Sequence, residues 1–246
     1  MIKTEEILIK GRKNKNFCDI FCYEPENIEE AALGNLYMVA ELATEKESSQ
    51  LVNLLGSLIK REYYCLPHRG PMESLEAGLK KANLTLNELA NQGNLEWLGK
   101  LHFICAVLNK ERELYLTQTG AAQAYLWREG RLASITKKIV PAPEKPHPAK
   151  TFQSVISGKI ELTDKLIFST PALFDFLSPP GFKQLFNLPK IENICDQINK
   201  LLREQKRPPS LGTLLIELEP EAVPETLSAA PISRTTPPIK LDEIIY

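Results

Sequence analysis

Three long segments of the chain repeat their apolar residues every three or four positions, which is the spacing of one face of an α-helix. These segments span residues 45–64, 71–92 and 189–206. Pro71 stands at the start of the second segment and Gly93 just past its end, where these residues are common in helices. We therefore predict three amphipathic helices, each with one buried stripe.

Other apolar residues alternate with polar ones or form short runs, which is typical of β-strands. The predicted strands are residues 19–23, 34–42, 101–109, 113–119, 122–128, 131–136, 151–157, 164–169 and 212–218. Short polar turns join the four strands between residues 101 and 136, so we expect these four to form a meander. Residues 141–149 contain four prolines and must be a loop.

The order of these elements favours an α+β fold over a parallel, doubly wound sheet, because the helices are grouped apart from the strands. We predict a four-layer αββα sandwich, in which two mostly antiparallel sheets pack face to face. The first two helices would cover one outer face, and the helix at 189–206 the other. Residues 1–218 would form this domain, and residues 219–246, which prolines interrupt, a flexible C-terminal tail.

Composition and charge narrow the function classes without naming one. Of 246 residues, 43% are hydrophobic and 25% charged, with a net charge of −1, which is ordinary for a globular protein. The near-neutral charge gives no reason to expect nucleic acid as a partner. No 18-residue apolar run or signal peptide is visible, so we expect no transmembrane segment. Five scattered cysteines suggest reduced thiols in a cytoplasmic protein.

The common catalytic and metal-binding patterns are weak in this chain. The three histidines are far apart, and His102 is best interpreted as a strand residue held by a neighbour. Cys18 and Cys22 lack the second pair that a zinc site would need. We expect Asp164 and Asp175 to cap or border elements. The chain has neither a glycine-rich phosphate loop nor a Gly-x-Ser-x-Gly elbow.

One predicted hairpin, residues 119–136, resembles a segment of a known enzyme family but lacks its acidic residue. The stretch "TGAAQAYLWREGRLASIT" resembles the segment V-G-D-S-R-A-Y-L, with its following turn and strand, of the metal-dependent protein phosphatases (protein phosphatase 2C, or PPM-type). Gly120 matches, as do the residues Ala-Tyr-Leu. Ala121, Ala122 and Gln123 stand where the family has Asp, Ser and Arg.

Two further stretches resemble metal-binding segments of the same family. Residues 35–59 are similar to the segment Val-x-Asp-Gly-x-Gly-Gly and its helix, with Glu41 on the Asp position and Leu42 on the Gly. Residues 158–178 are similar to the segment that ends in Leu-Leu-x-Ser-Asp-Gly. In that segment Thr170 and Pro171 replace the Asp-Gly pair.

A fourth stretch, residues 209–218, is similar to the closing Asp-Asn-x-Thr strand, with Ser210 near the Asp and Thr213 retained. The resemblance covers roughly residues 15–218 in the family's order. It implies the layered phosphatase fold with two Mg²⁺ or Mn²⁺ ions between the sheets, where a metal-bridging water attacks phosphorus. Such ions need oxygen ligands, and several carboxylates to offset a charge of about +4.

Only Glu41 falls on a family metal position with a carboxylate, so we expect no catalytic residue, bound metal or other cofactor here. Our first hypothesis is a catalytically inactive phosphatase-like module, a pseudophosphatase, that binds a protein partner such as a kinase or a phosphoprotein. The second is an active serine/threonine phosphatase with relocated ligands, and the third a structural domain of a larger assembly. The acids available to the second are Glu24, Glu26, Glu29, Glu30, Glu41, Asp164 and Asp175.

Overall fold

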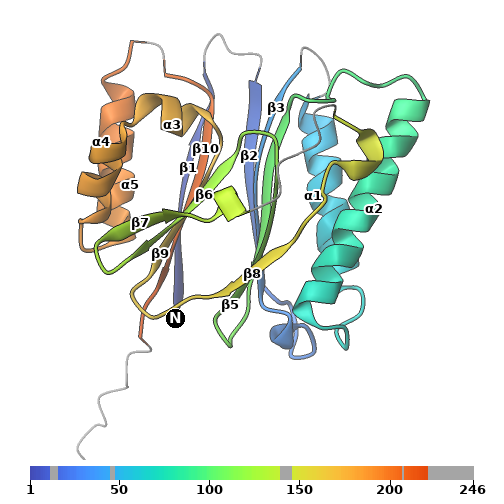
Figure 1. Ribbon diagram of the computed structural model, residues 1–246, viewed down its shortest axis with the longest axis horizontal. Helices are drawn as coiled ribbons and strands as arrows, with labels where there is room; N and C mark the ends of the chain where they lie inside the picture. Colours follow the sequence, from blue (N-terminus) through green and yellow to red (C-terminus); the bar gives the residue numbers. More distant parts are fainter. Residues whose placement is uncertain (12–15, 45–47, 139–145, 207, 221–246) are drawn as a thin grey trace, which may run out of the picture.

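Two five-stranded antiparallel sheets stack face to face, with helices on both outer faces (Figure 1). The computed structural model describes residues 1–11, 16–44, 48–138, 146–206 and 208–220. The predicted four-layer αββα sandwich is confirmed. None of the helices in these ranges is long and apolar enough to cross a membrane.

Each sheet draws its strands from distant parts of the chain. Sheet A has the order β1-β10-β9-β6-β7 and sheet B the order β2-β3-β4-β5-β8. The strands of sheet A are β1 (Ile2–Ile9), β6 (Gln123–Arg128), β7 (Arg131–Ser134), β9 (Lys165–Ser169) and β10 (Leu211–Leu218). Those of sheet B are β2 (Asn16–Tyr23), β3 (Asn35–Ala43), β4 (Leu101–Leu108), β5 (Glu113–Thr119) and β8 (Ile156–Lys159).

The three predicted helices lie where the sequence places them. Helices α1 (Ser48–Tyr64) and α2 (Pro71–Asn91) cover sheet B, and α5 (Ile191–Arg203) covers sheet A (Figure 1). Residues 45–47, which we assigned to the first helix, lie outside the described residues. Two short helices, α3 (Ala172–Phe176) and α4 (Pro179–Phe186), add to the cover of sheet A. Three single-turn 3₁₀ helices complete the elements: Glu30–Ala32, Thr136–Lys138 and Pro148–Lys150.

The apolar residues form three layers, because side chains of a strand point alternately to its two faces. In β3, Leu36 and Met38 pack against α1 and α2, whereas Tyr37 and Val39 pack between the sheets. The third layer joins sheet A to α3, α4 and α5. Strands buried on both faces therefore appear in the sequence as continuous apolar runs.

The predicted meander is wrong, because its four strands belong to two sheets. The hairpin β4–β5 lies in sheet B and the hairpin β6–β7 in sheet A. The chain changes sheets at Gly120, whose φ of +67° suits glycine. A period-two pattern is the same in either sheet, so the sequence could not show this change.

Three other expectations need correction. The strand predicted at 151–157 begins only at Ile156, because Phe152 packs with Phe103 in the layer beneath α2. Strand β1 was missed, since its lysine and glutamates obscure the alternation of an edge strand. Helix α4 was also missed. Residues 221–246 of the predicted tail lie outside the described part of the chain.

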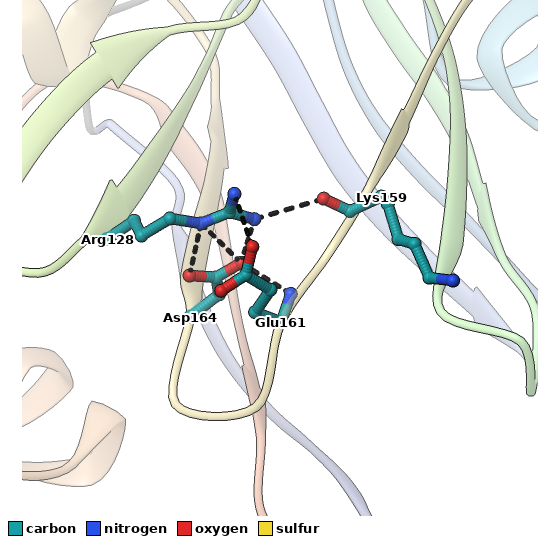
Figure 2. A network of polar contacts seen from close by, with 4 residues as sticks. All are labelled: Arg128, Lys159, Glu161 and Asp164. Atoms are coloured by element: carbon teal, nitrogen blue, oxygen red, sulfur yellow. Dashed lines mark hydrogen bonds and ion pairs between the residues drawn. The ribbon is translucent and has the colours of Figure 1, made fainter.

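A polar network ties the crossover between the sheets, which runs from β8 to β9, to the end of β6 (Figure 2). The Arg128 guanidinium donates from Nε to Asp164 Oδ1 at 3.0 Å and from Nη2 to Oδ2 at 2.6 Å. It also donates to the carbonyl oxygen of Lys159 at 3.0 Å and pairs with Glu161 at 3.0 Å. Asp164 accepts the backbone N–H of Glu161 at 2.7 Å, so it shapes the turn as we expected.

We predict that Arg128→Ala lowers the free energy of unfolding by roughly 3 kcal/mol, because it leaves the buried Asp164 carboxylate without its counter-charge. The matched control is Glu161→Ala. The Glu161 side chain is 62% exposed, so this change should cost less than about 1 kcal/mol. Urea unfolding of both variants measures the difference. Equal losses would mean that the network does not hold the crossover.

Candidate functional site

Three chemically active side chains form a row across sheet B at one end of the sandwich. Glu41 on β3 pairs with Cys18 on β2 and with His102 on β4. Directly opposed residues of an antiparallel pair point to the same face of the sheet. Since Val39 and Ile104, two positions along, pack between the sheets, the row also faces sheet A. This is the end of the sandwich where the family motifs place the metal site.

Glu41 is the buried acid of this row, with only 4% of its surface exposed. Its Oε1 accepts a hydrogen bond of 2.5 Å from Asn16 Nδ2, at the start of β2. Its Oε2 is buried and has no hydrogen-bond partner among the described residues. Burial raises the pKa of Glu41, and the polar groups of Asn16 and Thr170 offset this in part. The charge of Asp175 raises the pKa of Glu41 further.

Cys18 and His102, on either side of Glu41, are both in their neutral forms near neutral pH. Burial, and then the charge of Glu41, raise the pKa of the Cys18 thiol, which makes it a poor nucleophile and metal ligand. Burial lowers the pKa of His102. The Nδ1 atom of His102 accepts the N–H of Ala121 at 2.9 Å, so this histidine is held by a neighbour, as expected.

The opposite wall, at the end of β9 and the start of β10, is built from hydroxyl groups that bond one another or the neighbouring backbone. Ser169 Oγ lies 2.6 Å from Thr213 Oγ1. Thr170 Oγ1 accepts the N–H of Gly212 at 3.2 Å, and Thr170 N–H donates to the Gly212 carbonyl oxygen at 2.9 Å. These hydroxyls are therefore already engaged in holding neighbouring segments together. Ser210 has a similar role, since its Oγ accepts the N–H of Gly11 at 3.2 Å.

The six family-motif positions that the sequence singled out have different surroundings in the structure. They are Glu41, Leu42, Ala121, Thr170, Pro171 and Ser210. Glu41 and Thr170 face each other between the sheets. Ala121 is exposed beside Gly120, and a Cβ at Gly120 would lie 2.3 Å from His102 Nδ1. Pro171 caps α3 without a side-chain hydrogen bond. The remaining position, Ser210, directly precedes β10.

Leu42, which stands on the family's Gly position, points away from Glu41. Its side chain is buried in the layer beneath α1 and α2, on the face of sheet B opposite to Glu41. Adjacent strand residues point to opposite faces, so Leu42 can offer the site only its backbone. Sequence reasoning also missed Asn16, and it considered Cys18 only for a zinc site and not beside Glu41. The alternation of β2 was their only signal, and the register that brings them to Glu41 was not visible.

The other acids do not assemble around Glu41. Glu24, Glu26 and Glu30 lie near the opposite end of β3, where Tyr23 pairs with Leu36. Asp164 is engaged by Arg128. Asp175, exposed on α3, is close enough to affect Glu41 electrostatically. Within the described ranges, no group of three or more His, Cys, Asp or Glu residues could hold a metal ion.

The residues at this end of the sandwich do not fit a pair of Mg²⁺ or Mn²⁺ ions. Two such ions bring a charge of about +4 and require several carboxylate oxygens. The described wall residues supply one carboxylate, whose pKa is raised by burial, together with a thiol, an imidazole and bonded hydroxyls. Neutral hydroxyls can complete a coordination shell but cannot offset the charge.

No protein-family model matches the chain, and no curated protein is significantly similar to it. The fold, however, is similar to that of several solved structures. The serine/threonine phosphatase PstP/Ppp of Mycobacterium tuberculosis has a TM-score of 0.64 and 17% identity, over 89% of this chain and 99% of that one. PppA of Pseudomonas aeruginosa, described as a key regulatory component of T6SS, has a TM-score of 0.64 and 12% identity, over 88% and 97%.

The phosphatase domain of SpoIIE from Bacillus subtilis gives a TM-score of 0.60 and 10% identity, over 94% of this chain and 97% of that domain. The chain thus has the fold of the PPM-type serine/threonine phosphatases, and the resemblance found in the four motifs is confirmed at the level of the fold. Identities this low do not extend the chemistry of those enzymes to this chain.

We predict that Glu41→Gln stabilises the protein at pH 8 by on the order of 1 kcal/mol, because it removes a buried charge whose Oε2 has no partner. The pKa of Glu41 is raised in the folded state, so the folded protein binds this proton more tightly than the unfolded chain does. The stability of the protein therefore falls as the pH rises from about 4.3, the pKa of a glutamate in an unfolded chain, through the pKa of Glu41 in the folded protein.

The gain from Glu41→Gln should accordingly grow as the pH rises from about 4 to 8, which urea unfolding at several pH values measures. Asp175→Asn is the control, since Asp175 is exposed and should change stability much less. A Glu41→Gln effect that does not vary with pH would show that Glu41 has an ordinary pKa.

Proposed function

We propose that this protein is a catalytically inactive member of the phosphatase fold that acts by binding a protein partner, such as a kinase or a phosphoprotein. The observation that carries the proposal is the donor set around Glu41. One buried carboxylate with a raised pKa stands where two divalent cations would need several. The facing hydroxyls of Ser169, Thr170 and Thr213 are already hydrogen-bonded.

The replacements also have a physical rationale in a scaffold without metals. Several carboxylates gathered between two sheets would repel one another and would pay for their burial. Ala122, which stands on a family Ser position, is 1% exposed and belongs to the apolar layer between the sheets. Ser169 and Thr170 instead link the end of β9 to β10. These contacts support the interpretation that the residues around Glu41 now contribute to the stability of the fold.

Binding of a protein partner is supported by the retained scaffold. PstP, with the same fold, is described as a serine/threonine protein phosphatase, and PppA as a regulatory component. A protein of this fold that kept a surface for a protein partner but did not bind the cations would bind that partner without hydrolysing a phosphate ester. Ala121 lies exposed at the rim of the site end and would be part of such a surface.

The two alternatives predict different properties. An active phosphatase with relocated ligands needs acids near Glu41, and among the described acids only Asp175 meets that condition. A structural domain of a larger assembly would bind no partner through the residues around Glu41 or through the exposed Ala121 beside them. Metal titration separates the first alternative from our proposal, and partner capture separates the second.

We predict no Mn²⁺- or Mg²⁺-dependent hydrolysis of p-nitrophenyl phosphate or phosphopeptides at millimolar metal, because the single carboxylate cannot compensate two divalent cations. Isothermal titration with Mn²⁺ should likewise detect no tight binding. PstP assayed in parallel is the positive control. Robust Mn²⁺-dependent turnover that Glu41→Ala abolishes would contradict the proposal and support the relocated-ligand enzyme.

We further predict that a captured partner depends on the rim of the site. Ala121→Arg should weaken its binding at least tenfold, because a long cation would then occupy the rim, whereas Glu88→Arg on the exposed face of α2 should not. Affinity capture followed by direct titration with the purified partner measures this. Equal affinity of both variants would favour the structural domain.

A further inference from the structure

A groove of about 1030 Å³ opens at the end of the sandwich opposite Glu41. It lies between the starts of β1 and β3, the end of β10 and the turn from β4 to β5. These segments are at the lower edge of Figure 1. Its lining is more apolar than polar, with Ile2, Leu108 and Leu218 among the contributing residues. Because the groove is separate from the candidate site around Glu41, binding of a ligand in the groove does not depend on whether metals bind at that site.

Large apolar side chains stand exposed around this groove. Ile28 is 92% exposed, Met1 69% and Leu162 45%, and all three line the groove. Scattered exposed apolar residues are ordinary, but three that converge on one groove mark a binding surface. An apolar segment that covered them would be stabilised by the burial of all three.

The charges of the groove indicate which kind of segment fits. Lys110 and Arg112, in the turn from β4 to β5, form no ion pair with any residue that the structure describes. Of the three acids that line the groove, two are already paired with lysines, Glu26 with Lys60 and Glu219 with Lys3. The groove therefore favours a segment with apolar residues and adjacent acids.

Such a segment continues from the groove itself. Pro220 lines the groove, and the chain runs on from it through residues 221–246. Residues 239–246, "IKLDEIIY", combine five large apolar residues with the adjacent acids Asp242 and Glu243. The 18 residues from 221 to 238 could span on the order of 60 Å when extended and about 23 Å as a flexible chain. Either is enough to return residues 239–246 to the groove.

We propose that residues 239–246 bind in this groove of their own chain, with apolar side chains against Ile28 and Leu162 and the two acids near Lys110 and Arg112. Residues 221–238 then connect this segment to the groove. A short tether gives an effective concentration in the millimolar range, so modest contacts suffice for occupancy. Any other ligand of the groove would have to displace this segment.

Hydrogen exchange of the full chain, followed by mass spectrometry, tests the proposal. We expect amides in residues 24–31 and 108–112 to exchange at least threefold more slowly in the natural chain than in the double variant Ile244→Asp/Ile245→Asp. The control is Leu227→Asp/Ile232→Asp, which changes two apolar residues of the same tail outside the segment. The control should retain the protection. Equal exchange in all three proteins, or loss of protection in the control, would overturn the proposal.

A charge exchange tests the orientation of the segment. Lys110→Glu/Arg112→Glu should remove the protection, and adding Asp242→Lys/Glu243→Lys to the same protein should restore it. Failure of the second pair to restore any protection would overturn the assignment of the acids to these cations. Protection by the chain's own segment is independent of protein concentration. Protection that disappears on dilution would instead assign the groove to the segment of a second copy and overturn the proposal.

Discussion

The apolar layer between the two sheets is the contact on which the rest of the structure depends. Side chains from both sheets, such as Val39 and Ile104 on one and Phe168 and Leu214 on the other, are completely buried in it. Burial of such side chains contributes roughly 1.5–3 kcal/mol each. The layer sets which residues of every strand face inward, and by this alternation it also brings Cys18, Glu41 and His102 to the same face.

The polar end of this layer explains the character of the candidate site. The apolar core gives way to a row with one carboxylate. Hydroxyls that bond one another or the backbone of Gly212 face this row from sheet A. In an environment of low dielectric, one carboxylate without a counter-charge shifts toward its neutral form, as the raised pKa of Glu41 indicates. The same space with several carboxylates would need cations for its stability. The composition of this wall and the loss of metal chemistry that we propose are therefore two aspects of one electrostatic constraint.

How much the sequence could predict depended on whether a signal was local. The helices carry their periodicity within one segment, and the sandwich follows from the order of the elements. The edge strand β1 has Lys3, Glu5 and Glu6 in place of an alternating pattern, so it gave no local signal. The switch of sheets at Gly120 and the row Cys18–Glu41–His102 depend on strand pairing, which has no local signature. In this row the paired residues are 23 and 61 positions apart in the sequence. The opposite orientation of Leu42, by contrast, follows from strand alternation alone.

The proposed function requires that the end of the sandwich around Glu41 does not hold a pair of divalent cations. The most direct measurement is a crystal structure determined in excess Mn²⁺, with the anomalous signal of manganese used to locate the ions. The account predicts no anomalous peak beside Glu41, with the Asn16 and Thr170 side chains in the contacts described above. Two peaks between the sheets, with Glu41 Oε2 as a ligand, would contradict it.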